Sequence, residues 1–153
     1  MSEEFDLERR LGYNFSHKNL LKEALTHSSV LNEPEGSDLK SNQRLAYLGD
    51  AVISLIIAET FFKKIPEAKK GDLTEKRKQL VDDKFLARVA TRLNLNTHLI
   101  LGRGSERMGI HRETTALAEA FEALVGAIYL DDGIDKAKAV VLQVLKPDLE
   151  SLR

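Results

Sequence analysis

Residues 43–64, QRLAYLGDAVISLIIAETFFKK, form the longest apolar stretch of the chain. Their apolar side chains fall on nearly every side of a helix, which is typical of a central helix buried against several neighbours. The length is close to that of a membrane span, but Gly49 and Asp50 at one end and Glu59 near the other favour a buried helix. We therefore expect residues 43–64 to form the core helix of the fold.

The segments around this helix also carry apolar residues at helical spacing, separated by Gly, Pro and small polar residues. Residues 32–42 are the clearest loop, and residues 93–113 are expected to form a short apolar stretch followed by a mobile basic loop. No alternating strand pattern is present, so the sequence predicts an all-α fold. Helices are expected over residues 5–11, over 17–27 with Ser16 as N-cap, over 73–93 with Asp72 as N-cap and a break near 81–84, over 114–132 before Gly133, and from Ile134 to about Leu145.

The composition is that of an ordinary globular domain, and we expect residues 1–153 to form a single domain. The chain has no Cys, so disulfides and thiolate metal sites are excluded and any metal must be held by oxygen or imidazole ligands. The N-terminus is charged and lacks an apolar segment, which favours a cytoplasmic protein with no membrane partner. With 23 Lys and Arg against 24 Asp and Glu, any surface that binds nucleic acid must be local.

Three carboxylates lie in segments where the helical pattern otherwise holds apolar residues. Asp50 falls inside the core helix, and Glu119 and Glu122 are three residues apart, so they share one face of their helix. Carboxylates that are desolvated together repel one another unless a cation or an Arg neutralises them. Oxygen ligands without Cys suit Mg²⁺ or Mn²⁺, and Mg²⁺ commonly binds phosphate oxygens and an attacking water. The pattern therefore indicates hydrolysis of a nucleic-acid strand.

A structural explanation of the same carboxylates is equally compatible with their spacing. Asp50 would cap a helix or pair with an Arg such as Arg44, and Glu119 and Glu122 would be half-exposed and bridge to nearby Lys or Arg. The spacing alone does not separate the two explanations.

Residues 42–52, NQRLAYLGDAV, resemble the signature of the ribonuclease III family, N-E-R-L-E-F-L-G-D-[SA]-[VI]. Residues 11–29, 71–81 and 116–133 match family segments in the same order, with the sequences LGYNFSHKNLLKEALTHSS, GDLTEKRKQLV and ALAEAFEALVGAIYLDDG. The resemblance implies an all-α endonuclease domain that forms a homodimer. Two metal-bearing sites would then lie across a valley that holds a double-stranded RNA, and each site would cut one strand.

The resemblance assigns roles to the three carboxylates. Asp50 matches the signature aspartate, a metal ligand, and Glu122 matches the last glutamate of the D-A-x-E pattern, which coordinates the catalytic Mg²⁺. Glu119 replaces the aspartate of that pattern with a longer carboxylate. Asp50 and Glu122 are thus the expected catalytic residues, and all three are expected ligands of Mg²⁺, for which Mn²⁺ is expected to substitute.

The sequence departs from the family pattern at four positions. Gln43 and Ala46 stand where the signature has glutamates, and Lys70 and Ser105 fall where typical members have acidic residues, although Glu106 is adjacent to Ser105. One usual metal ligand is therefore missing, and the acidic site is thinner than in typical members.

These departures leave two interpretations. The mini-ribonuclease III subfamily has alanine at the position of Ala46, lacks a separate RNA-binding domain and is active, whereas the N-terminal segment here resembles the ordinary bacterial enzyme. On this interpretation the chain is a stand-alone catalytic domain. The alternative is a catalytically impaired ribonuclease III-like protein that binds RNA or a ribosome. Because Asp50 and Glu122 are retained, we favour an active endoribonuclease that acts in RNA processing.

Double-stranded RNA is bound mainly through phosphates and 2′-hydroxyls, so its contacts require Lys, Arg and small polar groups. One basic cluster spans residues 69–78 and is equally compatible with a solvated helix face. A second occupies the Gly-rich segment before Glu119 and is the preferred contact. The residues expected to bind the substrate are Gln43, Lys70, Arg103, Arg107 and Arg112.

Apolar residues of the signature helix are candidates for the homodimer interface. An isologous pair is expected because two symmetric sites are needed for two antiparallel strands. Each of these residues is equally compatible with the core of one protomer. The candidates are Leu45, Tyr47, Leu48, Val52 and Phe62.

Overall fold

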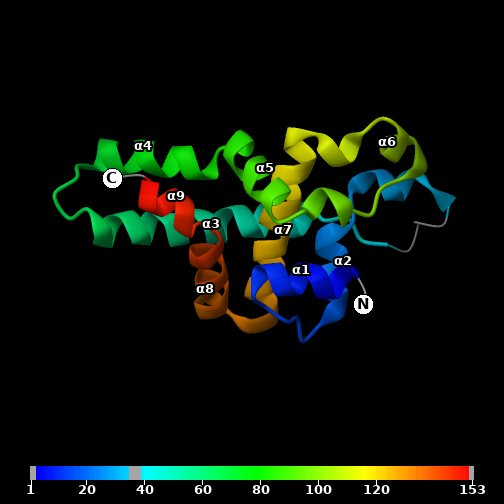
Figure 1. The fold of residues 1–153 in the computed structure, drawn as a ribbon, viewed down its shortest axis with the longest axis horizontal. Coiled ribbons are helices and arrows are strands. Elements are labelled where there is room, and N and C mark those ends of the chain that lie inside the picture. Colours follow the sequence, from blue (N-terminus) through cyan, green and yellow to red (C-terminus); the bar gives the residue numbers. More distant parts are fainter. Residues whose placement is uncertain (1–2, 35–38, 152–153) are drawn as a thin grey trace.

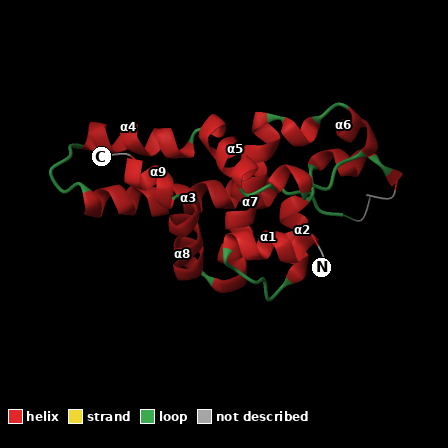
Figure 2. Cartoon of the chain, in the orientation of Figure 1, coloured by secondary structure: helices red, strands yellow, loops and turns green. Residues whose placement is uncertain are grey.

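The computed structural model describes residues 3–34 and 39–151, and this part of the chain is helical apart from its connections (Figure 2). The only β pairing within it is an isolated parallel bridge between Thr26 and Ile100. The all-α prediction is confirmed for the described residues. In chain order the α-helices and 3₁₀-helices (η) are α1 (Glu3–Leu11), α2 (Lys18–Leu25), η1 (Ser28–Asn32), α3 (Gln43–Lys64), α4 (Lys70–Val81), α5 (Asp83–Arg92), η3 (Leu95–Thr97), α6 (Arg103–Arg107), η4 (Ile110–Arg112), α7 (Thr114–Asp132), α8 (Ile134–Val144) and α9 (Lys146–Ser151).

Helices α3 and α7 form the centre of the molecule and cross one another (Figure 1). Helix α3 has the bounds expected from the sequence, and it packs against α2, α4, α7 and α8. It is long and apolar enough, by length and composition alone, to cross a membrane. Its buried face instead contributes to the core, as the sequence interpretation predicted. That face consists of Leu45, Ala46, Gly49, Val52, Ile53, Ile56, Ile57 and Phe61.

Helix α7 is the most enclosed helix among the described residues, because α2, α3, α5 and α8 all pack against it. Its core residues include Phe121, Leu124 and Ile128, which are at most 1% exposed. The helix ends where the sequence predicted, at Gly133, whose φ of +89° is a backbone conformation that L side chains rarely adopt. Gly133 then leads directly into α8.

Two predicted N-caps differ from the structure, and α1 begins at Glu3, two residues before the predicted start. Helix α2 begins after His17 and not after Ser16, whose backbone N–H donates to a side chain of α7. Helix α4 begins at Lys70, so Asp72 lies inside its first turn and accepts a hydrogen bond from the backbone N–H of Lys69. Both predicted caps were wrong. Ser16 is bound to a distant side chain, and Asp72 accepts its hydrogen bond from inside the first turn of α4.

The predicted break between residues 81 and 84 is confirmed. The Asp82 carboxylate accepts hydrogen bonds from the backbone N–H groups of Lys84 and Phe85, which ends α4 and starts α5. The predicted loop over 32–42 is described at residues 32–34 and 39–42, and residues 35–38 lie outside the described part of the chain. Beyond α8, the sequence analysis missed α9, because Pro147 is compatible with the first turn of a helix, where its missing N–H costs nothing.

The segment expected to be a basic loop contains η3, α6 and η4. Among the hydrogen bonds that hold it against the segment around η1, two are donated to side chains of that segment. The backbone N–H of Gly102 donates to the Ser29 hydroxyl at 2.9 Å, and the N–H of Arg103 donates to the Glu33 carboxylate at 2.8 Å. The segment is thus shaped by contacts to a distant part of the sequence.

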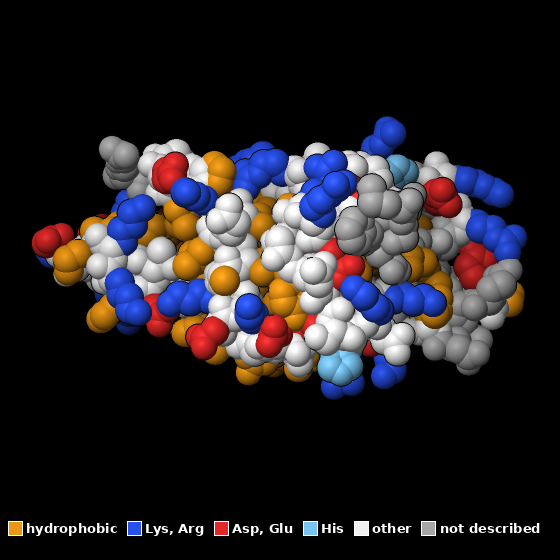
Figure 3. Space-filling view, turned by 60° about the horizontal axis from the view of Figure 1, so that its bottom comes forward, with side chains coloured by type: hydrophobic (Ala, Val, Ile, Leu, Met, Phe, Trp, Pro, Cys, Tyr) orange, Lys and Arg blue, Asp and Glu red, His pale blue; other side chains and the backbone are white. Residues whose placement is uncertain are grey.

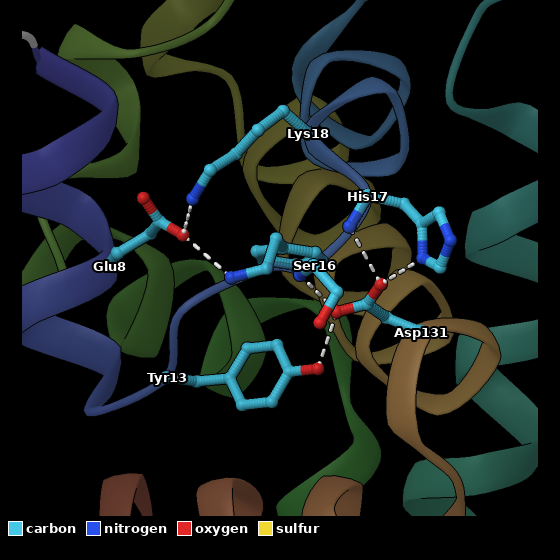
Figure 4. Close-up of polar contacts among 7 residues, drawn as sticks. Glu8, Tyr13, Ser16, His17, Lys18 and Asp131 are labelled. Carbon is cyan, nitrogen blue, oxygen red and sulfur yellow. Dashed lines mark hydrogen bonds and ion pairs between the residues drawn. The ribbon is translucent and has the colours of Figure 1, made fainter.

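A buried carboxylate near the end of α7 fixes the turn between α1 and α2 (Figure 4). Asp131 Oδ2 accepts hydrogen bonds from the Tyr13 hydroxyl at 2.5 Å and from the Ser16 N–H at 2.8 Å. Asp131 Oδ1 accepts from the His17 N–H at 2.9 Å and lies 2.7 Å from His17 Nδ1. The four contacts join residues more than 110 positions apart in the sequence.

A second carboxylate holds the other side of the same turn. Glu8 of α1 is 3% exposed, and its Oε2 accepts hydrogen bonds from the Phe15 N–H and from Lys18 Nζ, each at 2.6 Å (Figure 4). A buried carboxylate with such donors is compensated for its loss of hydration. Asp131 and Glu8 together clamp residues 13–18 onto the core.

The hydrogen bonds to Asp131 make its ionised form part of the folded state. Burial alone would raise the pKa of this carboxyl, but donors from Tyr13, Ser16 and His17 outweigh that effect and lower its pKa to about 2. In the unfolded chain an Asp titrates near ~3.9. Its stabilisation is therefore complete above about pH 4 and is lost as the pH falls toward 2.

We expect Asp131→Asn to lower the free energy of unfolding at pH 7 by roughly 2 kcal/mol, because an amide cannot accept all four contacts and loses the charge that strengthens them. The difference from the wild type should shrink between pH 4 and pH 2. Urea unfolding at several pH values measures both effects. The neighbouring exposed Asp132→Asn is the matched control, and equal behaviour of the two variants would refute the assignment.

Candidate active site

The site begins with an unusually close approach of α3 and α7. A Cβ added at Gly49 would lie 1.6 Å from the carbonyl oxygen of Glu122, and one added at Gly126 would lie 2.4 Å from the carbonyl oxygen of Leu45. Real Cβ atoms do not approach backbone this closely, so each helix presents a glycine to the other. The crossing places Asp50, which follows Gly49, beside Glu122.

Three carboxylates act on Glu122 at this crossing. The pKa of Glu122 is raised to about 8, chiefly by burial and then by the Asp50 carboxylate, which lies within hydrogen-bonding reach and acts through contact and charge. Asp83 at the start of α5 and Glu119 add smaller effects of the same sign. Asp50 is exposed, whereas Glu119 and Glu122 are half-buried, so the cluster opens to solvent.

The explanation by ion pairs is not supported by the described residues. Within residues 3–34 and 39–151, none of Asp50, Glu119 and Glu122 forms a salt bridge to Lys or Arg. Glu119 has a neutral partner, since the side-chain amide of Gln43 donates to its Oε2 at 2.8 Å. Asp50 and Glu122 remain as two adjacent carboxyl groups with no Lys or Arg partner among the described residues.

The carboxylates at the crossing can be compared with the ligands that a divalent cation requires. Within the described residues no three Asp, Glu or His side chains converge closely enough to form a ready-made metal site. Mg²⁺, however, commonly uses one or two protein carboxylates and keeps several waters. Asp50 and Glu122 meet that requirement, with Glu119 and Asp83 close enough to affect Glu122 electrostatically.

Two features of α5 were not predicted from the sequence as parts of a site. Asp83 is the second residue of an Asp-Asp pair at the α4–α5 break, which was interpreted only as a helix boundary. Lys84 and Arg88 of α5 line an open hollow of about 490 Å³ together with Arg112 and Thr114. The i to i+4 spacing of Lys84 and Arg88 was the available signal. Positive side chains thus lie on the helix that also carries Asp83.

The structure separates the residues predicted to bind a substrate. Arg103 and Arg107 are exposed on α6, and Arg112 is exposed at the end of η4, just before α7. Lys70 is exposed at the start of α4, beyond the far end of α3. From Asp50 to Lys64, its last residue, α3 runs 14 residues, or about 20 Å of helix. Within one protomer the three arginines are grouped, and Lys70 is not.

The surface charge is local, as the balanced composition predicted. On the face shown in Figure 3, Lys and Arg side chains are spread along the molecule and alternate with acidic and hydrophobic patches. No single basic field covers that face. An anionic ligand would therefore be bound through specific groups such as the hollow lined by Lys84, Arg88 and Arg112.

Comparison with known proteins identifies the family. A family model described as "Ribonuclease-III-like" matches residues 17–149. The chain belongs to the ribonuclease III family. It is 45% identical over 141 residues to the Ribonuclease 3 of Pelotomaculum thermopropionicum and 46% identical over 138 residues to that of Oleidesulfovibrio alaskensis. These matches cover 92% and 90% of this chain but 58% and 60% of the relatives, so the chain spans about 60% of their length.

The fold comparison gives the same family. The nuclease domain of ribonuclease III from Campylobacter jejuni, solved at 2.2 Å, superposes with a TM-score of 0.88 at 36% identity and covers 97% of both chains. Dicer from Pichia stipitis superposes with a TM-score of 0.64 at 24% identity, covering 89% of this chain and 57% of its own, which shows a shared fold only. The chain therefore corresponds to the nuclease domain of ribonuclease III, and the resemblance noted in the sequence is confirmed.

We expect Gly49→Ala to lower the free energy of unfolding by about 3 kcal/mol or more, because the new methyl group would meet the backbone of α7 and not a flexible side chain. Gly71→Ala is the matched control, since a Cβ at this position of α4 meets nothing within 4 Å. It should be neutral or stabilising by up to about 1 kcal/mol. Thermal and urea unfolding measure both changes, and a Gly49→Ala protein as stable as the wild type would contradict the close crossing.

Proposed function

We propose that this ribonuclease III domain is a divalent-metal-dependent endonuclease that hydrolyses phosphodiester bonds of double-stranded RNA in cytoplasmic RNA processing. The observation that carries the proposal is the Asp50–Glu122 pair. Two carboxyl groups are held together at the α3–α7 crossing without a Lys or Arg partner among the described residues, and Asp83, which acts on Glu122, is followed on α5 by Lys84 and Arg88, which line an open hollow.

The charge of the site supports Mg²⁺ as its cofactor, with Mn²⁺ as a substitute. Burial and neighbouring carboxylates make the ionised form of Glu122 unfavourable, and a bound cation would remove that cost. Asp50 and Glu122 are the residues that would hold the ion, with Glu119 as a third candidate. Mg²⁺ would supply neutralisation of the phosphate charge and activation of the attacking water.

The chain's own residues contribute binding and orientation. Gln43 donates a hydrogen bond to the Glu119 carboxylate, which restricts the orientation of that side chain. In this proposal Lys84, Arg88 and Arg112, which line one hollow, would bind phosphates of one strand, and the exposed Arg103 and Arg107 would add further contacts. Contacts of this kind recognise the RNA backbone and do not distinguish one base sequence from another.

A homodimer is part of the proposal. The candidate interface residues separate in the structure: Leu45 and Val52 are buried in the protomer, whereas Tyr47 and Phe62 are 84% and 71% exposed. Leu55 is 59% exposed and lies between these two on the same side of α3. The structure of a Campylobacter jejuni nuclease domain is described as having flexibility in a region involved in dimer formation, and it superposes with a TM-score of 0.86 at 37% identity. We propose that the exposed α3 face pairs two copies.

We expect the purified protein to cleave long double-stranded RNA at low salt with Mg²⁺ or Mn²⁺ and to be inactive in EDTA. Asp50→Asn and Glu122→Gln should each lower the rate by more than about 100-fold, because removing a carboxylate weakens charge stabilisation worth several kcal/mol. Asp135→Asn, an exposed carboxylate on α8, is the control for charge and should keep full activity.

Gel analysis of duplex and single-stranded RNA separates the outcomes. Duplex-specific cleavage that both variants abolish would support the proposal and show that Gln43 and Ala46 are tolerated. A shifted but uncut duplex with either metal would support the alternative of a catalytically impaired, RNA-binding or ribosome-associated protein. Equal cleavage by the wild type and both variants would refute the assigned site.

We expect Tyr47→Glu and Phe62→Glu to convert the dimer to a monomer, since each would bury an unpaired charge in an apolar interface. Met108→Glu is the matched control, because Met108 is 79% exposed and lies outside α3. Sedimentation analysis gives the mass in each case. A wild-type monomer at micromolar concentration, or a dimer that survives both substitutions, would contradict the α3 interface.

A further inference from the structure

The arginine-bearing segment, residues 103–112, follows a stretch of chain that is joined to the end of α2 by backbone hydrogen bonds (Figure 1). The Ile100 N–H donates to the Leu25 carbonyl at 2.8 Å, and the Ile100 carbonyl accepts from the His27 N–H at 2.9 Å. These two bonds accompany the isolated parallel bridge between Thr26 and Ile100. The chain is therefore fixed just before the arginine-bearing segment begins.

The contact continues through the side chains of His27 and Ser29. His27 Nδ1 accepts a hydrogen bond from the Ser29 N–H at 3.1 Å, so this ring nitrogen carries no proton. The Ser29 hydroxyl oxygen lies 2.9 Å from the same nitrogen, and the hydroxyl must therefore be the donor to it. The hydroxyl oxygen in turn accepts from the Gly102 N–H at 2.9 Å. The two side chains thus form a hydrogen-bonded relay that ends on the backbone immediately before the arginine-bearing segment.

Gly102 lies against this relay too closely for a larger residue. A Cβ added there would lie 2.6 Å from the Ser29 carbonyl oxygen, which belongs to the backbone and cannot rotate away. The Gly102 φ of −65° and ψ of 153° are open to L residues, so packing and not conformation requires the glycine. The next N–H, that of Arg103, donates to the Glu33 carboxylate at 2.8 Å. Two consecutive N–H groups are therefore held where α6 begins.

The residues that hold this segment and the arginines that it carries differ in exposure. Ser29 and Gly102 are buried and His27 is half-buried, whereas the three arginines are exposed. Ordering a mobile segment when a ligand binds costs free energy, and a segment that is already held avoids that cost. A support of this kind therefore acts on affinity although it does not touch the ligand.

We propose that His27, Ser29 and Gly102 position the arginine-bearing segment for contact with RNA phosphates, so that disrupting the relay weakens RNA binding although every arginine is retained. The three are positioning residues, because they act through the segment that follows them. The inference rests on the proposed function for the identity of the ligand, and it does not depend on the cleavage step.

The first experiment measures the dissociation constant, Kd, of the whole protein for a fluorescent double-stranded RNA by anisotropy, at low salt and in EDTA so that the RNA stays intact. His27→Leu and Ser29→Ala should each raise the Kd by about threefold to tenfold, because each removes a hydrogen bond of the relay. His27→Asn should keep the wild-type Kd, because its side-chain oxygen can accept from the N–H two residues further on. A role in stability alone would lower the folded fraction and leave the Kd of the folded protein unchanged.

A matched pair of glycine substitutions tests the contact itself. Gly102→Ala should raise the Kd by a similar factor, because its methyl group would push the segment away from the Ser29 carbonyl. Gly104→Ala is the control within the same segment, since a Cβ there meets nothing within 4 Å, and it should leave the Kd unchanged. In a protein that already carries Arg103→Ala and Arg107→Ala, Ser29→Ala should raise the Kd less than it does in the wild type, because the groups that it positions are gone.

The outcomes separate this inference from the proposed function. Raised Kd values for the three disruptive variants, with rescue by His27→Asn, would support the positioning role whether or not the protein cleaves RNA. Unchanged Kd values in folded variants, or equal effects of Gly102→Ala and Gly104→Ala, would overturn it, as would a wild-type protein that binds no duplex. Duplex that is bound through the relay but never cut with Mg²⁺ or Mn²⁺ would contradict the proposed cleavage alone.

Discussion

The backbone contact between α3 and α7 is the constraint on which the rest of the structure depends. Gly49 and Gly126 each face a carbonyl oxygen of the other helix, and neither position has room for a Cβ. This approach lets the two most apolar helices bury their faces directly against each other. The same contact fixes where the side chains beside the glycines project, so core packing and the position of the acidic site have one cause.

The acidic site is a place in the fold where ionisation of a half-buried carboxyl group is unfavourable. Burial and three neighbouring carboxylates oppose ionisation of Glu122, and no Lys or Arg of the described residues compensates. Elsewhere the chain satisfies its buried carboxylates, since Glu8 and Asp131 are surrounded by donors. Glu8 and Asp131 thus accept hydrogen bonds from several donors, whereas the nearest charged neighbours of Glu122 are other carboxylates. Perturbed groups of this kind are concentrated at functional sites.

Local sequence patterns predicted the features that depend on local chemistry. The bounds of α3, the end of α7 at Gly133 and the break at Asp82 follow from apolar spacing and capping, and Asp50 and Glu122 were recognisable as charges within apolar helices. The clamp on Asp131 was not predictable, because its partners are more than 110 residues away. Asp83 was missed for the same reason, since tertiary packing brings it close enough to act on Glu122.

The pairing of Gln43 with Glu119 explains how the site accommodates its departure from the family signature. Gln43 stands where the signature has a glutamate, and its amide nitrogen lies 2.8 Å from a Glu119 oxygen. A glutamate at this position would place a further carboxylate beside Glu119 and add repulsion to a site that already disfavours charge on Glu122. The amide instead donates to Glu119 and orients it. The site has therefore exchanged one negative charge for a hydrogen bond, which leaves Asp50 and Glu122 as the pair that a cation would neutralise.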